Sequence, residues 1–297
     1  MARADSVLSG VGTPAGSRVS VVVPTNQRWA HVAEVVRPIL PEAQALGVQV
    51  VVCGAGTDAV PDFPPGVTVV HDPGGDLYTA RARGLAAATG DIVTVLEDHV
   101  GVPTGWLTGL VREWASHPDA DALLYDVRCD PDASLIEQAL FTITFGPFMA
   151  TTEVPHDRSP VPGMVSLRRS FLPPDPAPGD FEYATLQQVA ASPRLQMVQL
   201  PAPVHAQYVT WRALPLNFHS GRAYGAACAA RTHHTRRIRQ ELARVWRQTL
   251  AARRRSSGSR PTVAFVACVA LLLGCHGAGQ ATGVVTRSAG RSHARLE

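Results

Sequence analysis

The stretch Ile92–His99 reads IVTVLEDH and decides the fold, because it joins an apolar run directly to a polar cluster. Its first five residues carry no charge and are mostly β-branched, which is typical of a strand buried on both faces. Ligands of α/β proteins bind beyond the carboxyl ends of such strands, where Glu97, Asp98 and His99 follow. The two carboxylates suit a hard divalent cation, and His99 as a third ligand favours Mn²⁺ over Mg²⁺. The alternative is a solvated turn.

Segments on both sides of this strand alternate between apolar runs and helical patterns. The predicted strands are Val19–Val23, Val48–Val52, Val67–Val70, Ile92–Leu96 and Ala122–Tyr125. The predicted helices are Trp29–Leu40, Leu77–Ala88 and Gly105–Ser116. This alternation predicts an α/β fold with a mostly parallel sheet flanked by helices. Candidate ligand residues therefore lie just after the strands, in 24–28, 53–58, 71–76 and 97–99.

The second half of the chain is less regular. It contains a predicted short strand at Met164–Arg168, a helix at Phe181–Ala191 and a strand at Gln196–Leu200. Residues 231–255 are predicted to form a basic amphipathic helix. The apolar run Val263–Leu273 that follows has 11 residues, fewer than the roughly 20 needed to span a bilayer.

Charge is distributed unevenly along the 297 residues, although the net charge is only +3. All 27 basic residues are arginine, and ten of them lie in residues 231–260 with a single acid, Glu241. An acidic body with a basic segment near its C-terminus indicates an anionic surface as partner. An interfacial membrane helix is favoured; a helix packed on the domain and a nucleic-acid patch are the alternatives.

Cysteine usage and the N-terminus bear on location. The five cysteines show neither a CxxC spacing nor an even framework, so a reducing, cytoplasmic setting is expected. Residues 1–17 lack the apolar region of a signal peptide and are predicted to be a loose leader.

One motif points to a different class of protein. Residues 54–59 read GAGTDA and match the dinucleotide-binding pattern G-x-G-x-x-A. That pattern requires a helix directly after the glycines, whereas residues 60–65 read VPDFPP, whose prolines exclude one. A dinucleotide-dependent dehydrogenase is therefore disfavoured.

Two further pairs of charged residues are candidates for chemistry. Arg81 and Arg83 lie on the predicted helix before the central strand, and arginine binds phosphate in a bidentate manner. Asp180 and Glu182 open a later helix, where a carboxylate serves either as a cap or as a general base.

Segments taken in order along the chain resemble the family 2 glycosyltransferases with a GT-A fold, in the nucleotide-diphospho-sugar transferase superfamily. They include Val19–Arg28 (VSVVVPTNQR), Ala80–Leu85 (ARARGL), Leu96–His99 (LEDH), Pro103–Leu107 (PTGWL), Gly163–Arg169, Gly179–Glu182 (GDFE), Asn217–Gly225 and the tail Leu273–Gly283. The resemblance covers about residues 18–285. It implies a GT-A domain over 18–230, with a donor half at about 18–126 and an acceptor half at about 127–230. Residues 231–297 would form the basic amphipathic helix and a short apolar tail.

The resemblance also implies roles for particular residues. Donor binding is expected at Pro24, Thr25, Asn26, Arg28, Asp58, Arg81, Glu97 and Asp98. A divalent cation, Mn or Mg, is expected at Asp98 and His99, and the catalytic base at Asp180, with Glu182 as its competitor.

The expected activity is an inverting sugar transfer from a nucleoside diphosphate sugar to a hydroxyl of a glycan, lipid or natural product. The alternative is a non-catalytic GT-A-like scaffold or sugar-nucleotide-binding protein, because 53–58 reads CGAGTD where the family usually has DDGSTD. The expected partners are the donor, the acceptor and a membrane surface contacted through residues 231–285. Nucleic acid is not expected as a partner. The expected location is the cytoplasm, peripheral on the inner face of the cell membrane.

Overall fold

The computed structural model describes most of the chain and allows the predicted elements to be compared with the observed ones. The described residues are 18–25, 29–55, 59–73, 75–146, 148, 160–205, 213–231, 236–257 and 261–287.

A seven-stranded sheet forms the centre of the protein, in the order β3-β2-β1-β4-β8-β6-β9. Its strands are β1 (Val19–Thr25), β2 (Gln49–Gly54), β3 (Val67–His71), β4 (Ile92–Val95), β6 (Ala122–Tyr125), β8 (Val165–Arg168) and β9 (Leu195–Val198). Only β8 runs antiparallel to its neighbours, β4 and β6. The prediction of a mostly parallel α/β sheet is confirmed.

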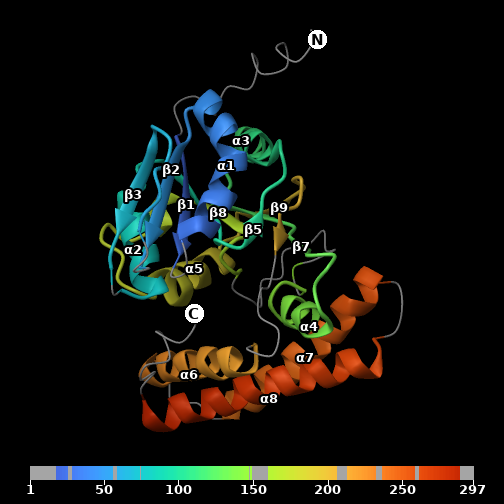
Figure 1. The fold of residues 1–297 in the computed structure, drawn as a ribbon. Helices are drawn as coiled ribbons and strands as arrows, with labels where there is room; N and C mark the ends of the chain where they lie inside the picture. Colours follow the sequence, from blue (N-terminus) through green and yellow to red (C-terminus); the bar gives the residue numbers. More distant parts are fainter. Residues whose placement is uncertain are drawn as a thin grey trace.

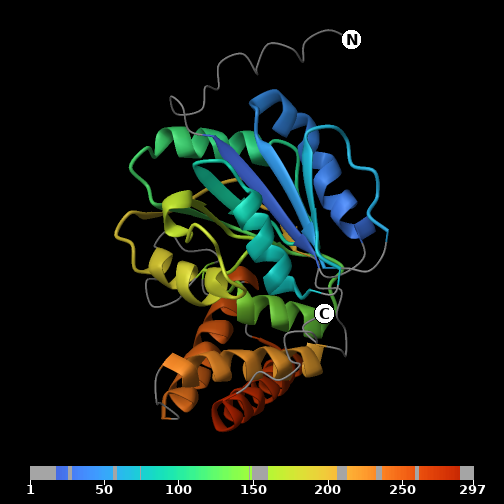
Figure 2. The same ribbon diagram turned by 90° about the vertical axis from the view of Figure 1, so that its left-hand side faces the viewer.

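Helices cover both faces of this sheet (Figures 1 and 2). On one face, α1 (Trp29–Leu46) and α3 (Trp106–Ser116) bury residues such as Trp29, Ile39 and Trp106 in one hydrophobic core. On the other, α2 (Leu77–Ala87) and α5 (Leu186–Ala190) share a second core with the helix α4 (Leu135–Thr144). The body thus has three layers. Because β1, β2, β3, β4 and β6 run in the same direction, their carboxyl ends lie at one edge of the sheet.

α1 extends beyond the predicted end at Leu40. It continues through Pro38 and Pro41 to Leu46. Val36, Ile39 and Ala43 are all buried against the sheet. Burial of this apolar face outweighs the cost of proline inside a helix.

A small second sheet closes over the loops that follow β4 and β6. It consists of β5 (Val100–Gly101), β10 (Val204–His205) and β7 (Arg128–Cys129), in the order β5-β10-β7. β5 begins one residue after His99, so the sheet anchors the far side of the Glu97–His99 turn.

Three long helices gather at one end of the molecule, with α4 between them and the main sheet (Figure 1). They are α6 (Ala213–Arg231), α7 (Arg236–Ser257) and α8 (Val263–Thr286). A third hydrophobic core joins α4, α7 and α8 through Ala139, Val245, Phe265 and Leu272.

The apolar tail is longer than the run Val263–Leu273 suggested. α8 has 24 residues, and in length and composition it could cross a membrane, which corrects the inference that this segment is too short. One side of it packs on α6 so closely that a methyl group added at Gly279 would lie 2.0 Å from the Phe218 carbonyl oxygen. The glycines and alanines after Leu273 thus continue the helix by packing against a neighbour.

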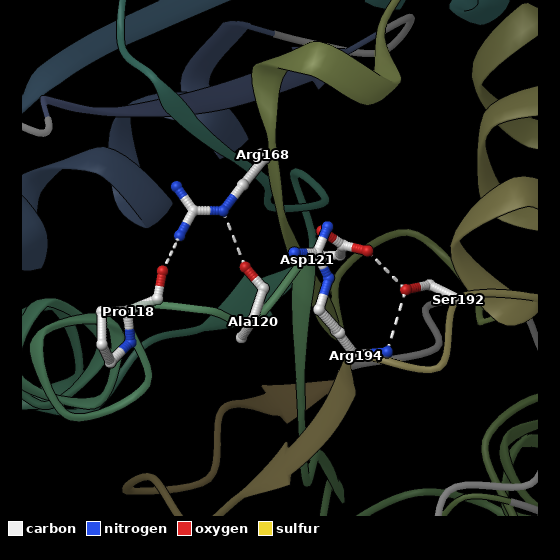
Figure 3. Close-up of polar contacts among 6 residues, drawn as sticks. All are labelled: Pro118, Ala120, Asp121, Arg168, Ser192 and Arg194. Atoms are coloured by element: carbon white, nitrogen blue, oxygen red, sulfur yellow. Dashed lines mark hydrogen bonds and ion pairs between the residues drawn. The ribbon is translucent and has the colours of Figure 1, made fainter.

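Polar contacts fasten the opposite edge of the main sheet, where β6 begins and β8 ends (Figure 3). Arg168 donates hydrogen bonds to the Ala120 and Pro118 carbonyls. Asp121 accepts hydrogen bonds of 2.6 Å from the Ser192 hydroxyl and from the Arg194 guanidinium. Ligands of such sheets bind at the carboxyl edge, so these contacts stabilise the fold.

Candidate active site

The turn after β4 presents three polar side chains at the carboxyl edge of the sheet. The Thr25 hydroxyl, at the end of β1, donates a hydrogen bond to the buried carboxylate of Asp98. His99 Nδ1 lies 3.0 Å from Asp98 Oδ1, and its Nε2 lies 3.3 Å from Glu97 Oε2. Both ring nitrogens are therefore engaged by carboxylates.

This arrangement favours a positively charged His99. Burial opposes the charge, but hydrogen bonds to Asp98 and Glu97 outweigh it and raise the pKa of His99 to about 10. At neutral pH the turn thus holds an imidazolium between two carboxylates.

A second charged pair lies at the same edge. Arg81, on α2, forms an ion pair with Glu182, which belongs to the π-helical turn Phe181–Thr185 leading into α5. The Arg81 side chain is only 4% exposed and that of Glu182 14%. Burial lowers the pKa of Arg81, but Glu182 and then Glu97 raise it above its ordinary value. The negative charge of Glu97 acts on Arg81, and this interaction links the pair to the turn that contains His99.

Asp180 forms its hydrogen bond within its own loop. Its carboxylate accepts a hydrogen bond of 2.9 Å from the Ala177 backbone N–H, and its side chain is half-buried. Gly179 precedes it with φ of 86°, a left-handed conformation that favours glycine and fixes the turn. Within the described residues, no hydrogen bond or ion pair joins Asp180 to the other candidates.

The structure thus brings Thr25, Glu97, Asp98 and His99 into one cluster and Arg81 onto Glu182. Pro24 lies in β1 opposite Cys53 of β2, and its side chain is buried. Asn26, Arg28 and Asp58 were also predicted to bind the donor, but they lie outside the described residues.

The end of β2 supports the exclusion of a dinucleotide-binding site. Residues 59–66 form no helix, and β3 begins at Val67. The helix N-terminus that the glycine pattern needs is therefore missing from this described segment.

One candidate escaped the sequence analysis. Asp126 directly follows β6 at the carboxyl edge, the position that singled out Glu97, yet the residues after this correctly predicted strand were not counted among the candidates. It is half-buried, and burial raises its pKa despite the opposing charge of Arg128. Applying the same rule to every strand would have found it.

The turn after β4 offers oxygen atoms to a divalent cation. In the described part of the chain, no three His, Cys, Asp or Glu side chains converge in the manner of a metal site. The oxygens of Glu97 and Asp98 are nevertheless of the kind that Mg²⁺ or Mn²⁺ prefers. Both are bound to His99, which can be a ligand only after it loses a proton. These residues are of the types that bind a divalent cation, but His99 competes with the cation for the two carboxylates.

Comparison with known proteins now gives the class. The model of glycosyl transferase family 2 matches residues 20–172, which is more than half of the chain. The chain therefore belongs to glycosyl transferase family 2, and its architecture is the GT-A fold. A comparison with curated proteins gives no match.

Several solved structures are similar to this chain. A mycobacterial protein is 18% identical with a TM-score of 0.50, over 77% of this chain and 80% of that one. Glucosyl-3-phosphoglycerate synthase from Mycobacterium tuberculosis, in complex with phosphoglyceric acid, is 17% identical with a TM-score of 0.47, over 76% and 85%. S. aureus TarS (residues 1–349) is 12% identical with a TM-score of 0.43, over 81% and 72%. At these identities the likeness describes the fold alone.

Proposed function

We propose that this family 2 glycosyltransferase moves a sugar from a nucleoside diphosphate sugar to a hydroxyl acceptor with inversion at the anomeric carbon. The observation that carries the proposal is the pairing of Arg81 with Glu182 beside the Glu97–His99 turn, at the ligand edge of the sheet. A buried arginine at this edge supplies the charge that a diphosphate needs.

The donor would bind across the carboxyl ends of β1 and β4. Thr25, Glu97 and Asp98 lie there, and Pro24 shapes the end of β1. Asn26, Arg28 and Asp58 stay predicted donor contacts. Arg81 would hold the leaving diphosphate.

Asp180 would act as the general base that deprotonates the acceptor hydroxyl. Its carboxylate carries one backbone hydrogen bond, whereas the competing Glu182 is held by Arg81. An ion pair would have to break before Glu182 could take a proton, which favours Asp180.

A divalent cation, Mn or Mg, would be held by Asp98 and His99 with the help of Glu97. When bound, it would neutralise charge on the leaving diphosphate. With or without the cation, the hydrogen bond from Thr25 orients Asp98. If the cation contributes, titration with a chelator lowers the rate of nucleoside diphosphate release; an unchanged rate in excess chelator refutes this role.

The base assignment is tested by Asp180→Asn. Removing a general base lowers the rate by about 10²–10⁴-fold. The measurement is release of nucleoside diphosphate from whichever UDP-, GDP- or dTDP-sugar raises the melting temperature of the protein. Affinity for that donor should stay the same.

The matched control is Asp175→Asn, an exposed carboxylate in the same loop that should behave like the wild type. A folded Asp180→Asn protein with a near wild-type rate would show that another group takes the proton.

A non-catalytic scaffold is the second candidate. The end of β2 favours it, because Cys53 and Gly54 stand where the family usually has two aspartates and carry no carboxylate for the nucleotide base. Cys53 is buried, and Gly54 packs against Trp29. This alternative predicts donor binding without release of nucleoside diphosphate for every sugar nucleotide tried.

Membrane contact through residues 231–285 is part of the proposal. Val263, Leu271 and Val285 of α8 are 87%, 57% and 82% exposed, and Arg247 and Arg254 of α7 are exposed. Exposed apolar side chains on one helix and exposed arginines on the helix before it suit a surface of anionic lipid. The protein would then act in the cytoplasm, on the inner face of the cell membrane.

A further inference from the structure

The ion pair between Arg81 and Glu182 joins parts of the chain that are 101 residues apart. Arg81 projects from α2 in the N-terminal half, and Glu182 from the turn that follows Gly179. Tyr78 and Phe181 line the same narrow cleft between α2 and this turn. The pair therefore connects α2 with this turn through charged groups.

We propose that Glu182 is a positioning residue, which holds the Arg81 guanidinium in place to receive the donor's diphosphate. The proposal rests on the proposed transfer reaction, and it removes Glu182 from the candidates for the base.

Burial explains why Arg81 needs such a partner. A guanidinium with 4% exposure has lost its water shell, and an unpaired charge in that position is strongly unfavourable. Glu182 binds it through Nη1, and Glu97 adds its negative field. Without Glu182, we expect the Arg81 side chain to leave this position or to turn toward Glu97.

The guanidinium also keeps donor capacity for a ligand. Its buried Nε–H finds no hydrogen-bond acceptor among the described residues, although buried polar groups are normally paired. Arginine presents its N–H groups in a fixed fork, so one edge can stay on a carboxylate while another binds phosphate oxygens. The donor without an acceptor is consistent with a guanidinium that is held by Glu182 and not yet fully used.

The test is Glu182→Gln, measured with the UDP-, GDP- or dTDP-sugar that binds the wild type. We expect the dissociation constant for the donor to rise about 10-fold or more, as for a lost charge-assisted contact. Release of nucleoside diphosphate at saturating donor should change less than about threefold, because Asp180 stays in place. Asp180→Asn should show the reverse pattern.

A double variant tells positioning from direct contact. If Glu182 acts through Arg81, adding Glu182→Gln to Arg81→Gln produces no further loss of donor affinity. Additive losses would overturn the proposal, as would donor affinity unchanged by Glu182→Gln alone. Arg112→Gln, which removes an exposed arginine of α3, is the control expected to bind normally.

Two outcomes separate this inference from the proposed function. A wild type that binds no sugar nucleotide refutes the function and the inference together. A wild type that binds and releases nucleoside diphosphate, with Glu182→Gln as active and as tight, refutes only the inference. If Glu182→Gln does not fold, Glu182→Asp keeps the charge and is compared in the same way.

Discussion

His99 shows how single side chains at this site carry linked charges. Its ring lies between the Glu97 and Asp98 carboxylates, and Asp98 is in turn bound by Thr25. Both carboxylates thus stabilise the positive charge of His99, and loss of that charge at high pH should weaken the turn.

His99→Gln tests this dependence. The pKa of His99 is raised from 6.5 to about 10 in the folded protein, so protonation favours folding. The stabilisation is complete below about pH 6.5 and is lost as the pH rises through about 10. Urea unfolding in the presence of a chelator should show a larger loss of unfolding free energy for His99→Gln at pH 6 than at pH 10.5. Equal losses at both values would contradict a charged His99.

At the residue scale, the sequence located Glu97 and Asp98 because a buried strand pattern marks its own carboxyl end. It did not pair Arg81 with Glu182, because helical spacing says nothing about contacts between distant segments. The sequence therefore left the competition between Asp180 and Glu182 for the base role open, and Asp180 is the choice that we propose.

Among the elements, α6 and α8 make an unusually close pair. Added methyl groups at Gly221, Gly225, Gly279 and Gly283 would each lie within 2.3 Å of a carbonyl oxygen on the other helix. Gly274 is also in α8 but has no atom within 4 Å of such a position. Within α8, close packing therefore requires glycine at position 279, whereas position 274 has room for a larger residue.

Gly279→Ala and Gly274→Ala form a matched pair of substitutions. Gly279→Ala should lower the free energy of unfolding by about 1–3 kcal/mol, because the helices must separate. Gly274→Ala should raise it by up to about 1 kcal/mol, because alanine favours the helix. Thermal unfolding measures both, and a stabilising Gly279→Ala would contradict the close pair.

At the element scale, the prediction succeeded for segments with a regular apolar pattern. It failed where contacts with neighbouring elements outweigh the helix-breaking tendency of proline and glycine. The strands of the sheet were found from their apolar runs. The ends of α1 and α8 were not, since prolines in the first and glycines in the second are accommodated by neighbouring elements.

For the whole molecule, an acidic body carries a cluster of helices that expose apolar side chains on α8 and arginines on α7. The outer side of α8 includes Val263, Leu271 and Val285, away from the α6 contact. This arrangement would place the body above a lipid surface.

Leu271→Glu should weaken binding to vesicles containing anionic lipid by about 10-fold or more, because a charge would enter the apolar layer. Flotation with such vesicles measures it, with Gln187→Glu, an exposed change on α5, as the control of equal charge. Equal flotation of both variants would indicate that α8 does not enter the lipid.

The antiparallel strand β8 sets the order in which the protein can be completed during synthesis. β4 and β6 have no direct pairing in the sheet, since β8 lies between them. A nascent chain that has passed Tyr125 therefore holds two strands with open edges until Arg168 leaves the ribosome. Open edges recruit other strands, so fragments that stop before Val165 should aggregate or require a chaperone.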